Sequence, residues 1–334
     1  MTLAKEYPKI MITGGGGYVA SALVPKLLSL GCKVAVLDLF LYGEDVLPSH
    51  PNLEKIKGDI RDIESVRKAA KGAQAIIHLA CISNDPSFEL NPELGKSINL
   101  DAFHNIIETV KEEKPKRFIY ASSSSIYGIQ DNPNVREDAP AKPLTDYSKF
   151  KLECEYILRK ANLPAETIWT IIRPATVCGY ANRLRLDLVV NVLTIHALVN
   201  KKIRLFGGSQ LRPNIVIDDM VNAYISLLEA PGKLVHREAF NAGYHNFSLE
   251  QIAQLVRDTL GDRKIEIITE KSNDLRSYHI NSDKIRERIG FEAKNGLEVA
   301  IKGLKEAYEK NLIESGLENP KYHNIKLMQQ VKLQ

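Results

Sequence analysis

Two patterns of apolar residues alternate through the first half of the chain. Short runs rich in β-branched residues predict strands at residues 10–13, 34–38, 75–79, 118–121 and 168–173. Helices that pack on a sheet carry apolar side chains three to four positions apart, and this spacing occurs at residues 18–30, 63–70, 95–110 and 148–163. The alternation predicts an α/β fold: a doubly wound parallel (Rossmann) sheet with helices on both faces.

The pattern changes after Arg173-Pro174. Helical spacing continues, but only short strand candidates and Gly or Pro turns separate the helical segments at residues 186–199, 218–228, 249–260 and 297–310. We therefore predict a smaller, mixed α/β C-terminal lobe. The expected division is residues 1–175 for the first domain and 176–334 for most of the second lobe. Because no long linker separates them, the chain is expected to cross back between the two, and the cleft between them is the natural ligand site.

A glycine-rich turn, Gly14-Gly15-Gly16-Gly17, joins the first predicted strand to the first predicted helix. Glycines let the backbone turn tightly and approach a pyrophosphate, which the free N–H groups at the start of the helix can then bind. Many glycine-rich turns bind nothing, so the context decides. Here Asp38 ends the next strand, where a carboxylate can accept hydrogen bonds from the ribose hydroxyls of adenosine, and the combination predicts a dinucleotide cofactor.

Two acidic residues bear on that cofactor. Leu39 and Phe40 follow Asp38 where an arginine would be needed, so a ribose 2′-phosphate would meet a negative charge with no nearby cation, and we predict NAD over NADP. Asp59, in Gly58-Asp59-Ile60, ends the third strand and can meet the adenine edge. Its alternative role is that of a cap for the helix at residues 63–70.

Tyr147 and Lys151 are the candidate proton-transfer pair. Their spacing at the start of a predicted helix places both side chains on one face. Free tyrosine ionises near pH ~10, so a tyrosine base needs a nearby positive charge at neutral pH. The spacing alone is not specific, because the chain repeats it at Tyr156/Lys160 and Tyr322/Lys326.

Position separates the three pairs. Only Tyr147 follows a strand that ends in a hydroxyl cluster, Ser122-Ser123-Ser124-Ser125, at the expected carboxyl end of the sheet. Doubly wound folds bind their ligands at that edge. The first pair is therefore the one expected to carry chemistry.

Together these motifs resemble those of the extended short-chain dehydrogenase/reductases. Within that family, the resemblance is to the nucleotide-sugar epimerase/dehydratase branch, which includes the UDP-glucose 4-epimerases. The resemblance rests on the Thr-Gly-x-x-Gly turn, His78-Leu79-Ala80, the serine-rich strand end, Tyr-x-x-x-Lys and Arg173-Pro174, and it runs from Lys9 to about Tyr308. Ala20 stands where the family has the third glycine of the turn, and we expect slight repacking with binding retained.

The resemblance implies an NAD-binding first domain and a set of site residues. The implied cofactor contacts are Gly14, Gly17, Tyr18, Val19, Asp38, Asp59, Ile60, Leu79, Ala80, Asn99, Tyr147 and Lys151. Asn99 matches a family asparagine that steadies the site through backbone contacts, although a plain helix-face amide would look the same. The catalytic serine or threonine of the family lies four residues before a Tyr-Gly pair, which selects Ser123, with Ser124 beside it as a substrate contact.

The implied reaction is hydride transfer between the sugar C4 and the nicotinamide while Tyr147 takes the hydroxyl proton. In the 4,6-dehydratases an Asp-Glu pair follows the catalytic threonine and expels water, whereas this chain has Ser124-Ser125 there. We therefore expect C4 epimerisation of a nucleoside-diphosphate sugar through a transient 4-keto sugar. The alternatives are a net 4-dehydrogenase or 4-ketoreductase, and a catalytically silent NAD-sensing protein on the same fold.

Three arginines are candidates for the substrate side. Arg212 matches the family arginine that grips the nucleotide diphosphate, and a guanidinium suits phosphate bidentately. Arg185 and Arg276 fall in segments that shape the nucleotide pocket in relatives. The alternative is that both are solvated charges on the protein surface. Cys178 can line the sugar pocket, but packing is the better interpretation.

Composition bears on the partners, the location and the metal content expected of the protein. Net charge is +4, from 45 basic and 41 acidic residues with no basic tract, so no nucleic-acid partner is expected. The first apolar run is too short for a signal peptide or membrane span, and we expect a cytoplasmic protein with no membrane partner. The four cysteines form no CxxC pair, so we expect buried thiols and no metal site. The resemblance implies a homodimer built on residues 95–110 and 148–163.

Overall fold

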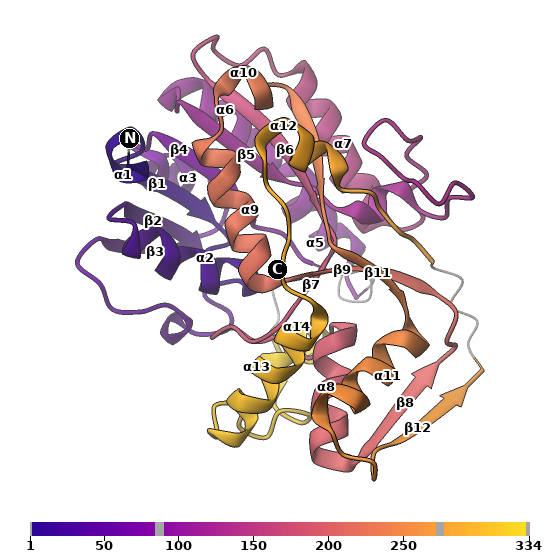
Figure 1. Ribbon diagram of the computed structural model, residues 1–334. Helices are drawn as coiled ribbons and strands as arrows, with labels where there is room; N and C mark the ends of the chain where they lie inside the picture. Colours follow the sequence, from indigo (N-terminus) through magenta and orange to yellow (C-terminus); the bar gives the residue numbers. More distant parts are fainter. Residues whose placement is uncertain (1, 84–89, 272–276, 332–334) are drawn as a thin grey trace.

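The computed structural model describes residues 2–83, 90–271 and 277–331, and its centre is a seven-stranded parallel sheet (Figure 1). The strand order is β10-β6-β5-β4-β1-β2-β3. The strands are β1 (Lys9–Thr13), β2 (Lys33–Asp38), β3 (Leu53–Lys57), β4 (Ala75–His78), β5 (Arg117–Ala121), β6 (Ile168–Pro174) and β10 (Glu238–Ala242). The doubly wound fold is confirmed, and all five predicted runs fall on strands.

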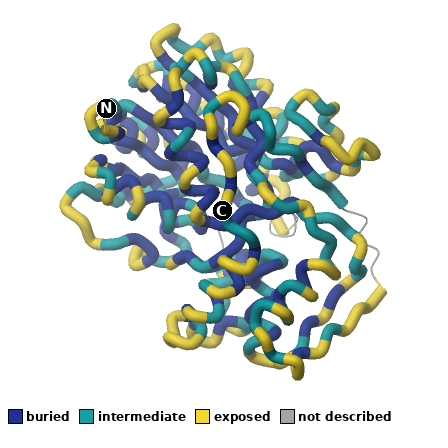
Figure 2. The backbone as a smooth tube through the Cα atoms, viewed as in Figure 1, coloured by how far each residue is buried: buried dark blue, intermediate teal, exposed yellow. Residues whose placement is uncertain are grey.

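Helices cover both faces of this sheet. One face carries α1 (Leu3–Glu6), α2 (Tyr18–Ser29), α9 (Ile217–Glu229), α10 (Gly232–Val235) and α12 (Asp283–Ile289), and the other carries α3 (Ile63–Ala70), α6 (Phe103–Glu113) and α7 (Asp146–Lys160). Successive strand residues point to opposite faces, so Ile10 and Ile12 join the core under α2 while Met11 joins the core under α3. In Figure 2 the tube through the central strands of the sheet is mostly dark blue, which marks buried residues.

Two strands of the sheet were not among the five predicted apolar runs, although Asp59 was expected to end a strand. β3 has only one buried residue, Ile56, because it lies at the edge of the sheet and carries charged side chains. β10 comes from the second half of the chain and pairs in parallel with β6. Its short apolar stretch does not stand out from the loops around it, so only the tertiary structure reveals it.

The helix predicted at residues 95–110 is interrupted. It is built from α5 (Pro92–Lys96), a π-helix at η2 (Ser97–Asp101) and then α6. The Ala102 N–H donates to the Ser97 carbonyl at 3.0 Å, which is the i to i−5 bond of a π-turn. Within that turn the Asn99 amide is bonded in both directions to the Ile82 backbone, at 2.8 and 2.9 Å. The wide turn thus ties the helix to the loop after β4.

In the part of the second lobe that the structure describes, two small sheets pack with four further helices. The sheets consist of β7 (Thr176–Cys178), β9 (Leu211–Val216) and β11 (His245–Ser248), and of β8 (Lys202–Phe206) with β12 (Glu266–Glu270). The helices are α8 (Val189–Asn200), α11 (Leu249–Leu260), α13 (Leu297–Glu309) and α14 (Asn324–Gln330). Pairing is parallel between β7 and β9 but antiparallel between β9 and β11, so this lobe is mixed α/β. Short 3₁₀ turns occur at η1 (Glu44–Val46), η3 (Ser124–Tyr127) and η4 (Pro320–Tyr322).

The chain crosses back between the two lobes. Residues after 175 return to the first domain as α9, β10 and α12, while the domain boundary itself stays a prediction. Within the described residues, none of the helices is both long enough and apolar enough to cross a membrane.

Candidate cofactor and catalytic site

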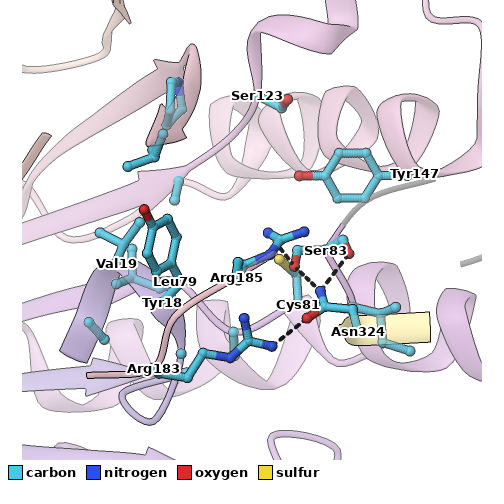
Figure 3. A pocket seen from close by; sticks show the side chains of 18 of the residues that line it. Tyr18, Val19, Leu79, Cys81, Ser83, Ser123, Tyr147, Arg183, Arg185 and Asn324 are labelled. Carbon is cyan, nitrogen blue, oxygen red and sulfur yellow. Dashed lines mark hydrogen bonds between the residues drawn. The ribbon is translucent and has the colours of Figure 1, made fainter. Parts of the chain in front are cut away.

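One cavity lies at the carboxyl ends of the central strands and extends to the second lobe (Figure 3). It opens where the chain order reverses, between β1 and β4, which is the place where doubly wound sheets bind ligands. The predicted site residues that line it are Gly14, Gly17, Tyr18, Val19, Asp38, Asp59, Ile60, Leu79, Ala80, Ser123, Ser124, Tyr147, Lys151 and Arg185. The fold therefore gathers the glycine turn and the proton-transfer residues around one space.

The glycine turn is shaped for close approach. Gly14 has φ +70°, and a Cβ there would lie 2.6 Å from the backbone of Ala80, which follows β4. Its N–H donates to the Leu37 carbonyl at 2.9 Å, which ties the turn to β2. Gly17 is the N-cap of α2 and has no side-chain cap, so the first N–H groups of that helix are available to a ligand.

We predict that Gly14→Ala destabilises the protein and weakens NAD binding by at least tenfold. The added Cβ is strained at positive φ and also pushes the turn away from Ala80. Gly72→Ala is the matched control, because Gly72 also has φ +70° but its Cβ would meet nothing within 4 Å. The control should lose only about 1–2 kcal/mol of stability and keep its affinity. Equal NADH titrations for the two variants would contradict the role of the turn.

The two acidic residues of the cavity are held differently. Asp38 accepts hydrogen bonds from the Gly16 N–H at 3.0 Å and the Phe40 N–H at 2.7 Å. Burial raises the pKa of Asp38 above its ordinary value, although these two backbone bonds oppose the rise. Asp59 pairs with Arg61 at 2.7 Å.

The alternative role of Asp59 as a helix cap is wrong. The cap of α3 is Asp62, whose carboxylate accepts from the N–H groups of Glu64 and Ser65. Because Asp62 is the residue immediately before α3, it satisfies those orphan donors. Asp59 therefore remains a candidate for the adenine edge.

The proton-transfer pair lies on the first two turns of α7. Thr145 caps this helix in a reciprocal box with Ser148, which fixes the start of the helix beside β5. Lys151 is buried, and its ammonium donates to the Ala121 carbonyl at 2.8 Å and lies 5.9 Å from the centre of the Tyr147 ring. The Tyr147 hydroxyl points into the cavity (Figure 3). Neither Tyr156 nor Tyr322 lines it.

The serine cluster forms the tight turn η3 after β5. The Ser123 hydroxyl accepts from the Ser125 N–H at 3.1 Å and lies 2.8 Å from the Ser125 hydroxyl. Ser124 is buried, and all three serines line the cavity. Ser123 thus has a fixed position on the same wall of the cavity as Tyr147.

A buried ion pair supports this turn from behind. Arg173 donates to both oxygens of Glu155, at 2.9 and 2.7 Å, and a further donor, the Ser122 hydroxyl, reaches the same carboxylate at 2.6 Å. The guanidinium also donates to the Tyr127 hydroxyl at 2.7 Å. β6, α7 and η3 are joined through these groups.

His78 ends β4 between the glycine turn and the lysine. Its Nδ1 lies 2.7 Å from the Thr13 hydroxyl, and its ring packs against Phe103 and Tyr120. Burial, and secondarily the charge of Lys151, lower the pKa of His78 to about 3. The imidazole is therefore neutral wherever the protein is folded at ordinary pH.

This depressed pKa makes stability fall in acid. Unfolded histidine binds a proton near pH ~6.5, whereas His78 in the folded chain does so only near pH 3, so the unfolded state holds more protons between these values. Its contribution is lost as the pH drops below ~6.5, with a slope of at most ~1.4 kcal/mol per pH unit. In urea unfolding from pH 7 to 4.5, His78→Gln should show a shallower decline than wild type, and His104→Gln, exposed on α6, an unchanged one. Parallel curves for wild type and His78→Gln would contradict this.

Three of the predicted site residues are not placed on the cavity wall. Asn99 lies behind it, bonded to the Ile82 backbone. Arg212 is on β9, donates to the Leu211 carbonyl, and has its guanidinium 5.5 Å from the ring of Tyr278, which does line the cavity. Arg276 falls outside the described residues.

Cys178, Cys81 and Arg185 differ in their burial and in whether they line the cavity. Cys178 is fully buried, its thiol pKa is raised by burial, and it packs away from the cavity. Cys81 was expected to be buried but is half-buried and lines the cavity, because it follows the carboxyl end of the central strand β4, where the cavity opens. Arg185 is paired with Asp187 at 2.9 Å and donates to Ser83 at 3.1 Å, so it is not a solvated surface charge.

Sequence reasoning missed Arg183 and Asn324. Both are buried and line the cavity. Arg183 stands two residues before Arg185 in the same segment, so the positive pair was a usable signal. Asn324 had none, because it lies beyond the part of the chain that carries the family motifs.

The residues present fit a dinucleotide. The glycine turn packs so closely on the backbone of Ala80 that Gly14 has no space for a Cβ, the start of α2 offers N–H groups to phosphate, and Asp38 lies where a ribose diol can donate. Arg183 adds a buried cation with nitrogens that have no hydrogen-bond partner within the described chain.

Comparison with known proteins agrees with this site. The model of the NAD dependent epimerase/dehydratase family matches residues 10–243. UDP-glucose 4-epimerase of Lactobacillus helveticus is 25% identical over 86% of this chain and 92% of its own. UDP-glucuronic acid decarboxylase 4 of Arabidopsis thaliana is 26% identical over 91% of this chain and 70% of its own.

A solved structure shows the same fold. UDP-glucose 4-epimerase from Thermotoga maritima, solved with UDP-glucose, has a TM-score of 0.80 at 24% identity and covers 91% of this chain and 99% of that chain. The family match spans well over half of the residues and includes the glycine turn, Ser123, Tyr147 and Lys151. The chain therefore belongs to the NAD-dependent epimerase/dehydratase family and is an NAD-dependent nucleotide-sugar enzyme.

Proposed function

We propose that this protein epimerises a nucleoside-diphosphate sugar at C4 through a transient 4-keto sugar. The observation that carries the proposal is that Ser123, Tyr147 and Lys151 share one cavity wall, on which none of the described lining residues is a carboxylate. Bound NAD⁺ would supply reversible hydride transfer at the sugar carbon. UDP-sugars are the first candidates, because several relatives are UDP-glucose 4-epimerases.

The residues of the chain then handle one proton. Tyr147 takes it from the sugar hydroxyl as the carbonyl forms and returns it after the sugar has turned over. Lys151 favours the tyrosinate electrostatically, and its bond to Ala121 keeps it buried beside that ring. Ser123 orients the reacting hydroxyl through a hydrogen bond from the rigid turn.

The acidic residues argue against loss of water. Among the described residues that line the cavity, the carboxylates are Asp38, the last residue of β2, and Asp59, which follows β3, and both lie at the glycine-turn side. Ser124 and Ser125 occupy the positions after Ser123, and hydroxyls are poor proton donors and bases. Dehydration requires an acid and a base near the sugar C5 and C6, and this wall offers neither.

On the substrate side we propose Arg185 and Arg212 as contacts of the nucleotide diphosphate. Arg185 already faces the cavity, and Arg212 lies over Tyr278 at its edge. Arg276 stays a prediction. Guanidinium groups bind phosphate bidentately, so two of them suit a diphosphate.

The test is a panel of UDP-, dTDP-, GDP- and CDP-hexoses incubated with the purified protein and followed by NMR. Epimerisation predicts interconversion of the two C4 epimers with no net NADH and no deuterium incorporated from D₂O. Stoichiometric NADH with release of a 4-keto sugar would identify a net dehydrogenase instead. A 4-keto-6-deoxy sugar or loss of CO₂ would overturn the proposal.

We also propose a cytoplasmic homodimer that pairs through α6 and α7. Tyr156, on α7, keeps 46% of its surface exposed, and pairing of α7 with a second copy of the chain would cover it. Light scattering should report twice the chain mass for the wild type and one chain mass for Tyr156→Glu. A monomeric wild type would contradict the dimer.

A further inference from the structure

Arg183 is a buried cation with no carboxylate in salt-bridge contact within the described chain, and Asp38 and Asp187 act on it only at longer range. It is 3% exposed, and its Nε and Nη1 atoms have no hydrogen-bond partner among the described residues. Its guanidinium carbon lies 3.6 Å from the centre of the Tyr42 ring, and its Nη2 donates to the Asn324 side chain. A buried, unpaired charge is costly to folding, so the arrangement is better explained by an anion that binds there.

The backbone around Arg183 is fixed to the start of α2. The Arg183 N–H donates to the Ser21 hydroxyl at 3.2 Å, and the Tyr18 hydroxyl donates to the Gly179 carbonyl at 2.5 Å. Both partners lie on the first turn of α2, directly after Gly17. Because helix N-termini attract phosphate, the guanidinium lies on the side of the cavity where a dinucleotide diphosphate belongs.

Asn324 holds the guanidinium from the opposite side. This side chain of α14 accepts from Arg183 and from the Tyr42 hydroxyl, the latter at 3.0 Å. Its amide nitrogen donates to the carbonyl and hydroxyl of Ser83, at 3.2 and 3.1 Å. Figure 3 shows Asn324 between Ser83 and Arg183. The last described helix thus forms part of the cavity wall.

We propose that Arg183 binds the diphosphate of NAD and that Asn324 is the positioning residue that holds it there. This inference rests on the cofactor of the family and is independent of which sugar reacts. Two other anions are less suitable. A ribose 2′-phosphate would lie against the Asp38 carboxylate. The diphosphate of the sugar nucleotide is assigned above to Arg185 and Arg212, and Asp187 already neutralises part of the charge of Arg185.

The first experiment compares Arg183→Met with Arg286→Met, an exposed arginine on α12 that removes the same charge far from the cavity. Affinities for NAD⁺, ADP and UDP are measured by calorimetry, and for adenosine by ligand-observed NMR. Arg183→Met should weaken NAD⁺ and ADP about 10- to 100-fold and adenosine less than about threefold, because only the first two carry the diphosphate. Arg286→Met should change none of them.

Several outcomes would overturn the proposal. They are an unchanged affinity for ADP, an equal loss for adenosine and ADP, and a loss confined to UDP, which would assign Arg183 to the sugar nucleotide. Misfolding is separated by thermal unfolding without ligand. Because methionine removes an unpaired buried charge, ligand-free Arg183→Met should unfold no earlier than wild type, while its stabilisation by NAD⁺ should be smaller. These are binding measurements, so they stand whether or not the sugar reaction is assigned correctly.

The positioning role is tested with Asn324→Asp. The new carboxylate gives Arg183 an internal partner that competes with phosphate, so NAD⁺ affinity should fall about as far as in Arg183→Met. Asn324→Leu is the variant for a double-mutant cycle, because it removes the acceptor without adding a charge. In the double variant Arg183→Met/Asn324→Leu, the loss should not exceed that of Arg183→Met by more than about threefold, because both changes act through one guanidinium. Additive losses would show that Asn324 acts independently and would overturn its assigned role.

Discussion

Tyr147→Phe should lower the turnover of the sugar by about 10²- to 10⁴-fold, the range expected when a positioned general base is lost. The change removes one hydroxyl group and leaves the ring on α7, so the capping box and the bond from Lys151 to Ala121 remain. NAD⁺ affinity should therefore stay within about threefold of wild type. The measurements are kcat with the sugar found in the screen and calorimetric titration of NAD⁺.

The chain offers a matched control for this variant. Tyr156 has the same spacing to a lysine, lies on the same helix and is exposed outside the cavity. Tyr156→Phe should keep both turnover and affinity. If Tyr147→Phe retained wild-type kcat, another group would have to be the base, and the assignment of the whole cavity wall would be wrong.

The sequence predicted the parts of the fold that depend on local pattern. Each predicted strand is apolar because it is buried on both faces, as with Ile10, Met11 and Ile12 of β1. The glycine turn was readable for a similar reason, since Gly14 has no room for a Cβ. β3 was not among the predicted apolar runs because an edge strand with one buried residue does not show that pattern.

The unpredicted parts depend on contacts between distant residues. At the π-turn the Asn99 amide bonds to Ile82, 17 positions away. The spacing of apolar residues in a helix cannot predict a bond of that kind. Asn324 reaches Ser83 across 241 positions. Arg183 could be recognised as a charge from the sequence, but its lack of a partner is a property of the folded cavity.

Glu155→Gln should lower the free energy of unfolding by about 3–5 kcal/mol, because it leaves the Arg173 guanidinium buried without its carboxylate. The pair is almost fully excluded from water, with side-chain exposures of 8% for Arg173 and 1% for Glu155, so solvent cannot replace the lost charge. The loss should extend to activity, since Ser122 and Tyr127 on either side of Ser123 are bonded to the same pair. Urea unfolding monitored by tryptophan fluorescence gives the stability.

The interpretation of this loss depends on two further variants. Glu153→Gln removes the same charge from an exposed position on α7 and should cost less than about 0.5 kcal/mol. The double variant Glu155→Leu/Arg173→Met removes both charges together, and replacing a buried pair by apolar groups should recover a large part of the stability. It should not recover turnover, because the bonds to Ser122 and Tyr127 that fix η3 are still missing. Recovery of both would show that the ion pair serves packing alone, whereas recovery of stability without turnover would show that it holds Ser123 in its catalytic position.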